Sequence, residues 1–447
     1  MFDVIVIGAG ISGLMCANIL SRTGLRVLVL EKAPKIGGML QGFTRRGVSF
    51  DTGFHYVGGL GPGESLEWIF RYHRMMDLPW VPLDASEEVC LEGERYLIPC
   101  GFDAFVDGMA RYFPSERAGL AAYAEALQNL GSHIKDLDFD RIPFFEKSAA
   151  AFLSETIREP RLRRVLTMMG PRMEMRLESL PFYEYAQISG SFIESAWRLD
   201  GPAVQLAEVL AGQVRRQGGD IRCGCGVESI AAQTVTAGGQ AFSAPHIIST
   251  LPPACTVALA EGLRPSYRHR IQSLEETGGM FTAYLELAPG RVPYVNHGVS
   301  LDGPVFVHFY PPQKGGAWAD RIELMMPVSQ WPAARDAGYA RWKASLTAQG
   351  LAVAETRFPG LKDAVKAVYT SSPLTWQRYT GSASAFGVRK DYRAVLNTVL
   401  SCRTPLPGLW LAGQSVALHG LLGVSMTVLN TISQIYGKQL IRKEFAL

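Results

Sequence analysis

The chain has 447 residues and a net charge of +3, and 47% of its residues are hydrophobic against 19% charged. This balance is typical of a globular protein and excludes a disordered or fibrous one. The basic excess is small and scattered, so nucleic acid is not expected as a partner. Seven cysteines show neither a disulfide framework nor a metal-binding spacing. They indicate reduced thiols in a cytoplasmic protein and predict no metal site.

The first thirty residues predict a dinucleotide-binding unit. The apolar run 4–7 is typical of a buried parallel strand, and a G-x-G-x-x-G turn follows it and opens a helix. Such glycines permit a tight turn, the close approach of a pyrophosphate, and the packing of helix against strand. A second strand over 26–30 ends at Glu31, whose carboxylate suits ribose hydroxyls. The predicted contacts of this unit are Gly8, Gly10, Ile11, Ser12, Gly13, Glu31 and Lys32.

The next segment, "EKAPKIGGMLQGF", places the glycine pair Gly37 and Gly38 just past the acidic strand end. It resembles the extension found in two-dinucleotide-domain flavoproteins of the amine oxidase and carotenoid desaturase superfamily. The resemblance implies FAD as cofactor and a segment that runs beside the flavin. Met39 departs from the pattern, because a basic residue is frequent there. The expected fold class is α/β, a Rossmann-type FAD domain with an inserted α+β substrate domain.

The stretch "DTGFHYVGG" resembles the D-T-G-x-H-Y-x-G segment of the retinol saturase and carotenoid isomerase branch of that family. The resemblance implies that Asp51, Thr52 and Gly53 form a tight turn close to the flavin. It also implies that His55 and Tyr56 face the substrate, where both can carry protons. The alternative is that these two side chains only pack and form hydrogen bonds in a core.

The C-terminal region is predicted to supply a second segment that contacts the same cofactor. "LWLA", residues 409–412, is expected to be a short buried strand, and a helix is expected to start near Gly420. The pattern resembles the C-terminal flavin motif of the family, in which a helix start faces the flavin N1 and O2. His419 stands just before that helix, either as a proton donor or as a capping and filling residue. The positions carried over from the motif are Gly413, Gln414, Gly423, Val424 and Ser425.

The middle of the chain is expected to complete the FAD domain. A helix over 204–217 precedes short strands. By resemblance, Val227 contacts the adenine and Leu251 ends near the phosphates. The predicted FAD domain is therefore discontinuous, and the substrate domain has a helical part and an antiparallel sheet. The predicted ranges are 1–64, 201–261 and 366–447 for the FAD domain, and 65–200 and 262–365 for the substrate domain.

Residues 161–182 mix arginines with methionines. One interpretation is a patch that lies on a membrane surface and admits lipid substrates. The favoured one is that the methionines fill a malleable cavity and the arginines form a solvated face. No continuously apolar run reaches membrane-spanning length, so any membrane contact is expected to be peripheral. The residues concerned are Met168, Met169, Met175, Arg161, Arg163 and Arg164.

The resemblance implies an FAD-dependent oxidoreductase that acts on the C=C or C–C bonds of a hydrophobic polyene or isoprenoid by hydride exchange at the flavin N5. Reduction of a C=C bond is favoured over desaturation or isomerisation, because "DTGFHYVGG" sides with the saturase branch. The alternatives are a flavin amine oxidase-type enzyme and a non-enzymatic lipid-binding relative of the GDP-dissociation inhibitors. The intact glycine motif argues against the latter.

No second Rossmann fingerprint is present in the sequence, although a dedicated NADPH domain would carry one. Transient binding of NAD(P)H in the substrate cleft and an electron-donor protein are therefore the two expected sources of electrons. The sequence carries no signal for the oligomeric state.

Overall fold

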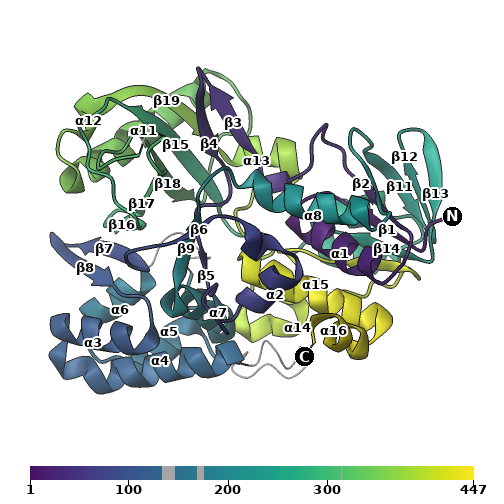
Figure 1. Cartoon of the computed structure of the whole chain (residues 1–447), viewed down its shortest axis with the longest axis horizontal. Coiled ribbons are helices and arrows are strands. Elements are labelled where there is room, and N and C mark those ends of the chain that lie inside the picture. The colour runs from purple at the N-terminus through teal and green to yellow at the C-terminus, as the bar shows by residue number, and fades with distance from the viewer. Residues whose placement is uncertain (133–145, 169–175, 314, 447) are drawn as a thin grey trace.

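The computed structural model describes residues 1–132, 146–168, 176–313 and 315–446. Three parts are visible in Figure 1: a parallel sheet near the N-terminus, a seven-stranded sheet, and a group of helices below the latter. The same buried apolar cluster runs from the parallel sheet into these helices. The parallel sheet and these helices therefore share one core, while most of the seven-stranded sheet has a core of its own.

The parallel sheet has the strand order β10-β2-β1-β14-β20. Every neighbouring pair in it is parallel. Strand β1 contributes alternate residues to two separate cores, Val4 and Val6 on one side and Ile5 and Ile7 on the other. This explains why its sequence is continuously apolar rather than alternating. The strands are β1 (Val4–Ile7), β2 (Val27–Leu30), β10 (Asp220–Arg222), β14 (His246–Ser249) and β20 (Leu409–Leu411).

Helices cover one face of this sheet, where α1 packs against both α8 and α15. A small antiparallel sheet, β11-β12-β13, packs on the other side. The predicted strand, turn and helix at the N-terminus, the helix from Val204 and the helix from Gly420 are all confirmed. The elements are α1 (Ile11–Arg22), α8 (Val204–Arg216), α15 (Gly420–Tyr436), α16 (Lys438–Phe445), β11 (Val227–Ala231), β12 (Thr234–Ala237), β13 (Gln240–Ser243), α9 (Pro253–Leu259) and α10 (Pro265–Gln272).

The seven-stranded sheet has the order β19-β15-β18-β17-β16-β7-β8. It is mixed, because β16 and β7 are parallel while the other pairs are antiparallel. Its outer strands come from residues 87–98, in the segment expected to be helical, and from residues 365–371. The elements are β7 (Glu87–Leu91), β8 (Glu94–Ile98), β15 (Gly279–Leu287), β16 (Val299–Leu301), β17 (Val305–Phe309), β18 (Arg321–Val328), β19 (Val365–Ser371), α11 (Ala337–Arg357), α12 (Leu361–Ala364), α13 (Pro373–Thr380) and α14 (Val395–Thr398).

Alternation along β17 and β18 divides their side chains between two faces. Val307 and Leu324 belong to the core that includes residues of α11. Phe306 and Met325 point the other way and form a different cluster with Tyr56. His308 is two residues from Phe306 and Glu323 is two residues from Met325, and the two are register partners. They therefore lie on that second face.

The helical part lies beside β7 and β8 in Figure 1. Arg161 and Arg164 in α6 form ion pairs with Glu92. Met169 and Met175 lie outside the described residues. No described helix is long and apolar enough to cross a membrane. The remaining elements are β3 (Gly42–Arg45), β4 (Val48–Asp51), β5 (Val57–Gly58), α2 (Glu67–Tyr72), β6 (Trp80–Pro82), α3 (Phe102–Tyr112), α4 (Arg117–Ser132), α5 (Ala149–Thr156), α6 (Pro160–Thr167), α7 (Phe182–Glu194) and β9 (Ala196–Leu199).

Candidate active site

A cavity of about 700 Å³ reaches from the carboxyl ends of the parallel strands to the seven-stranded sheet. Parallel strands bring all their carboxyl ends to one edge, which is where ligands of such sheets bind. Of the predicted site residues, all but Gly13, Asp51 and Ser425 line the cavity. Those that line it are Gly8, Gly10, Ile11, Ser12, Glu31, Lys32, Gly37, Gly38, Met39, Thr52, Gly53, His55, Tyr56, Val227, Leu251, Gly413, Gln414, His419, Gly423 and Val424.

We call the part of the lining that follows β1, β2, β10 and β14 the glycine-rich wall; it comprises residue 8 and residues 10–12, 31–32, 37–39, 226–227 and 250–252. Gly8 has a φ of +102°, and a Cβ there would lie 2.5 Å from Thr250 Oγ1. A Cβ on Gly13 would lie 2.0 Å from the Gly8 carbonyl oxygen. Gly10 has open space where its Cβ would be. The three glycines thus permit the turn, the helix packing and the approach of a ligand.

Glu31 is fixed at the end of β2 by two backbone donors. The N–H of Ala9 donates to Glu31 Oε2 over 2.7 Å, and the N–H of Ala33 donates to Oε1 over 2.8 Å. A carboxylate has about four acceptor sites, so capacity for ligand hydroxyls remains. This carboxylate therefore joins the motif turn to the second strand while it lines the cavity.

The predicted glycine pair packs directly on the motif. The N–H of Gly37 donates to the carbonyl of Ala9 over 2.8 Å, and a Cβ on Gly38 would lie 3.2 Å from the Gly10 Cα. Both glycines have positive φ. The turn at Gly53 in turn rests on Met39, whose carbonyl oxygen would lie 2.7 Å from a Cβ at position 53.

The C-terminal motif brings the positive end of α15 to the cavity, because residues 419–424 line it. Gly423 fits tightly, since a Cβ there would lie 2.5 Å from the Leu418 Cβ. Ser425 is turned away and fully buried, and its hydroxyl donates to the Leu421 carbonyl over 2.7 Å. Its position one turn into the helix gives it an internal hydrogen bond instead of a place in the lining.

The part of the lining on the side of the seven-stranded sheet, which we call the apolar wall, consists of large apolar and aromatic side chains. Tyr56 belongs to it and donates its hydroxyl to Glu87 Oε2 over 3.4 Å. Such a wall suits a hydrophobic ligand with few polar groups. Its members are Tyr56, Phe192, Met280, Phe306, Met325 and Phe386.

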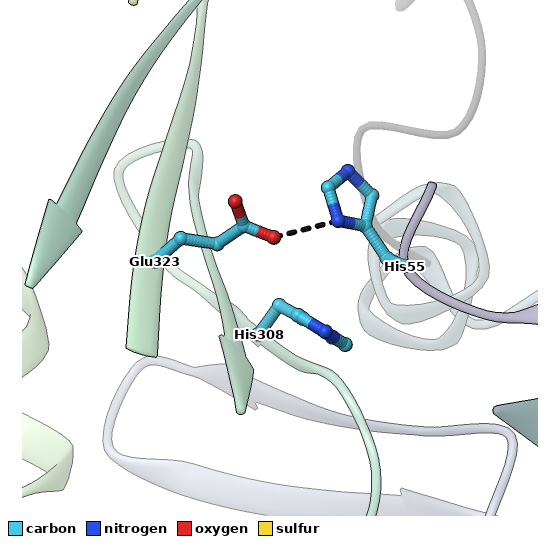
Figure 2. Close-up of side chains that lie close together, drawn as sticks. All are labelled: His55, His308 and Glu323. Carbon is cyan, nitrogen blue, oxygen red and sulfur yellow. Dashed lines mark ion pairs between the residues drawn. The ribbon is translucent and has the colours of Figure 1, made fainter. Parts of the chain in front are cut away.

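His55 lies at this wall and is paired with a buried carboxylate that the sequence analysis did not single out. Its Nδ1 lies 2.6 Å from Glu323 Oε1, and the side chains are 19% and 0% exposed (Figure 2). The hydroxyl of Tyr310 donates to Glu323 Oε2 over 3.0 Å. Burial lowers the pKa of His55, but the charges of Glu323 and Asp51 outweigh it and raise that pKa above its ordinary value.

Asp51 and His308 lie behind His55 rather than in the lining. The Asp51 carboxylate accepts from the Ala203 N–H over 3.1 Å. Burial raises the pKa of Asp51 to about 6, and Glu323 adds to this rise. The ring centroids of His308 and His55 are 5.1 Å apart. Burial lowers the pKa of His308 well below its ordinary value, and the nearby charge of His55 acts in the same direction.

His55, His308 and Glu323 bring three potential metal-ligand atoms within 4.8 Å of one another. The separation of 2.6 Å between His55 Nδ1 and Glu323 Oε1, however, is that of a close histidine–carboxylate ion pair. Two ligand atoms at about 2.0–2.1 Å from one zinc ion in tetrahedral geometry lie roughly 3.3 Å apart. The geometry therefore favours an acid–base pair.

His419 has a carboxylate partner of its own. Its Nδ1 lies 3.0 Å from Glu184 Oε1, and both side chains are buried. The ring of Phe386 lies 4.6 Å from its imidazole. Glu184 is in the first turn of α7, which lies more than two hundred residues away in the chain, so no local pattern pointed to it.

Lys390 supports the loop after β20 from outside the cavity. Its ammonium donates to the carbonyls of Thr398 and Ser415, each over 2.8 Å. Burial lowers the pKa of Lys390 to about 8, and the charge of Glu184 opposes this. The segment "GVRKD" holds this lysine, and its composition alone did not identify the role.

The fold and this cavity define a flavoprotein, and the comparisons agree. Residues 11–289 match the model of the flavin containing amine oxidoreductase family, so the chain belongs to that family. The family's flavin implies FAD, for which the glycine-rich wall, Glu31 and the start of α15 are suited.

Among curated proteins, the chain is similar to all-trans-retinol 13,14-reductase. Identity is 25% for the Macaca fascicularis protein and 24% for the Homo sapiens protein, over 98% of this chain and 86% of each relative. Prolycopene isomerase 1 of an Oncidium hybrid cultivar is 30% identical over 31% of this chain and 24% of its own length. The similarity to the reductase thus extends over nearly the whole chain, whereas the similarity to the isomerase is limited to about a third of it.

Solved structures share the fold. An oxidoreductase from Methanosarcina mazei has a TM-score of 0.68 at 18% identity, covering 96% of this chain and all of that one. Putrescine oxidase has a TM-score of 0.67 at 16% identity, covering 100% and 99%. The expected α/β flavoprotein fold is thereby confirmed.

Proposed function

We propose that the chain is an FAD-dependent oxidoreductase that reduces a C=C bond of a hydrophobic conjugated polyene or isoprenoid. One observation carries the proposal: a single cavity joins a glycine-rich wall to an apolar wall, and His55, paired with a buried carboxylate, lies at the latter. The similarity to all-trans-retinol 13,14-reductase over nearly the whole chain supports this choice of reaction.

The residues present divide the work between binding and proton transfer. Gly8, Gly10 and Glu31 would hold the nucleotide part of FAD, and the start of α15 would face its pyrimidine edge. When bound, the flavin supplies a hydride to one carbon of the double bond. The chain supplies the proton for the other carbon, and we assign this step to the imidazolium of His55. The apolar wall excludes water and aligns the polyene.

His419 and Tyr56 have different surroundings. His419 is paired with Glu184 directly before α15, so we assign it to the flavin side of the cavity. Tyr56 donates to Glu87, so we assign it to the wall that orients the substrate. The electrons would come either from NAD(P)H that visits the cavity or from a donor protein.

The test is an anaerobic flavin experiment. The purified protein is loaded with FAD, reduced with one equivalent of dithionite, and mixed with all-trans-retinol or a carotenoid. Return of the oxidised flavin band with loss of polyene absorbance supports reduction of a C=C bond. A shifted polyene band with the flavin still reduced would instead indicate isomerisation. Oxidised flavin that is reduced by an amine, together with reduced flavin that is reoxidised by oxygen but by no polyene, would indicate amine oxidation and contradict the proposal.

The variant His55→Ala should lower the rate of polyene-dependent reoxidation by about 10²–10⁴-fold, the usual contribution of a positioned acid. His269→Ala, which alters an exposed histidine on α10, is the matched control and should react like the parent. Equal rates for the parent and His55→Ala would remove His55 from the mechanism.

A further inference from the structure

In the pair formed by His55 and Glu323, the histidine lies at the cavity and the carboxylate lies on its buried side. His55 follows β4 at the cavity, whereas Glu323 lies inside β18 with no exposed surface. The carboxylate meets Nδ1, and Figure 2 shows the other ring nitrogen turned away from Glu323. The carboxylate thus faces the nitrogen on the protein side and leaves the second nitrogen for a ligand.

Glu323 is itself held in place. The hydroxyl of Tyr310 lies 3.0 Å from Glu323 Oε2 and 3.0 Å from the carbonyl oxygen of Asp51. His308 lies across the register from Glu323. The sheet therefore fixes this carboxylate on one side of the His55 ring, with little freedom to rotate.

We propose that Glu323 is the positioning residue of His55, which fixes the imidazole ring and keeps it protonated so that Nε2–H delivers the proton to the substrate carbon. In that step the Nε2–H bond breaks, its electron pair stays on nitrogen, and a C–H bond forms. This proton and the hydride together saturate the double bond. His55 is left neutral, Glu323 stays an anion, and water restores the proton after product leaves. The inference rests on the proposed function.

The titratable groups around His55 are Glu323, Asp51, His308 and Tyr310, and burial raises the pKa of Tyr310 well above its ordinary value. Glu323 and Asp51 favour its charged form, whereas burial disfavours that form. His308 is kept neutral by burial, and Arg321 and Arg198 act on Asp51 and His308 rather than directly on the ring. Glu323 is thus the main charge that opposes desolvation of the imidazolium.

The test compares Glu323→Gln with Glu286→Gln. Glu286 lies on the neighbouring strand β15 and pairs with Lys366 at the surface, so its variant is the matched control. The pKa of His55 is measured by histidine NMR in the protein without substrate. It should fall by about 1 to 3 pH units in Glu323→Gln, the usual effect of losing an adjacent opposite charge. The control should leave it in place.

The second readout is the pH profile of polyene-dependent flavin reoxidation. In the parent the rate should fall as the pH rises through the pKa of His55, and in Glu323→Gln this fall should move to lower pH. Reoxidation by oxygen should keep its rate in both proteins. If Glu323→Gln does not fold, Glu323→Asp withdraws the carboxylate by one methylene and should move the pKa in the same direction by less.

An unchanged pKa of His55 in a folded variant would overturn the role of Glu323. If the pKa falls as expected but no polyene reoxidises the flavin of the parent, the proposed function fails while the positioning role of Glu323 stands. The two failures are therefore distinguishable.

Discussion

The two walls of the cavity are made of different parts of the chain. At and directly behind the glycine-rich wall, the missing Cβ atoms of Gly38 and Gly13 would meet backbone atoms of other motif glycines, and that of Gly8 would meet the Thr250 side chain. On the apolar wall the close contacts are side chains, among them His55 with its buried partner Glu323. On the first wall there is little room for an added atom at Gly8 and Gly38, whereas Gly10 faces open space. The second can be altered group by group, so its chemistry can be tuned without changing the fold.

The largest effect is expected at Gly13, directly behind the glycine-rich wall. Gly13→Val would place a branched side chain where even a Cβ lies 2.0 Å from the Gly8 oxygen. Overpacking of this kind against backbone should cost at least about 3 kcal/mol of unfolding free energy and abolish flavin retention. Thermal unfolding and the flavin content of the purified protein check this.

The control is Gly212→Ala in α8, where a Cβ would meet only the Arg216 guanidinium at 3.5 Å. Alanine in a helix interior should be neutral or stabilising by up to about 1 kcal/mol. A Gly13→Val protein that binds flavin and has the melting temperature of the parent would show that the turn behind the glycine-rich wall can adjust to a larger side chain.

A smaller effect is expected where a side chain supports the backbone. Lys390→Met leaves the carbonyls of Thr398 and Ser415 without their buried donor. The unfolding free energy should fall by about 1–3 kcal/mol, and flavin should be lost more easily on dialysis. Lys443→Met, at an exposed position in α16, is the control. Equal flavin retention in the two variants would contradict a role for Lys390 in shaping the loop.

The smallest effect is expected near the apolar wall, where Asp51 should make the free energy of unfolding depend on pH. The pKa of Asp51 in the folded protein is raised from 3.8 to about 6. The folded state therefore binds this proton more tightly, and the associated stability is present below about pH 4 and lost as the pH rises through 6. Asp51→Asn keeps an acceptor for the Ala203 N–H but removes the charge.

Relative to the parent, Asp51→Asn should gain on the order of 2 kcal/mol of unfolding free energy between pH 4 and pH 7. Denaturant unfolding at both pH values measures the difference, with the exposed Asp363→Asn as control. Parallel stability curves for the parent and Asp51→Asn would mean that burial of this carboxyl has no energetic consequence.

The same contrast explains which parts of the site could be predicted from sequence. The glycine-rich wall and the turn behind it need glycines at a fixed spacing between a strand and a helix. Gly8, Gly10 and Gly13 can therefore be recognised within one short stretch of sequence. The structure brings Glu31, from the next strand, to the same turn. Short-range chain geometry determines these contacts, and local patterns record it.

The partners of the two histidines could not be found in this way. Glu323 is one polar residue in the apolar strand "IELMMPV", and only the alternation of β18 and its pairing with β17 turn it toward His55. Glu184 meets His419 across more than two hundred residues. Such pairs depend on tertiary register. The signal that could have identified Glu323 is a single carboxylate in an otherwise apolar strand, because a buried charge needs a partner.

The parallel sheet also fixes when, during synthesis, the site can first exist. Its strands come from residues 4–30, 220–249 and 409–411, and α15 follows only from residue 420. Contacts at such sequence separation form late and slowly. During synthesis the residues of the glycine turn would therefore emerge long before residues 409–424, which form the opposite side of the site. Loading with cofactor then has to wait until residues 409–424 are made, and bound FAD would stabilise the folded state by mass action.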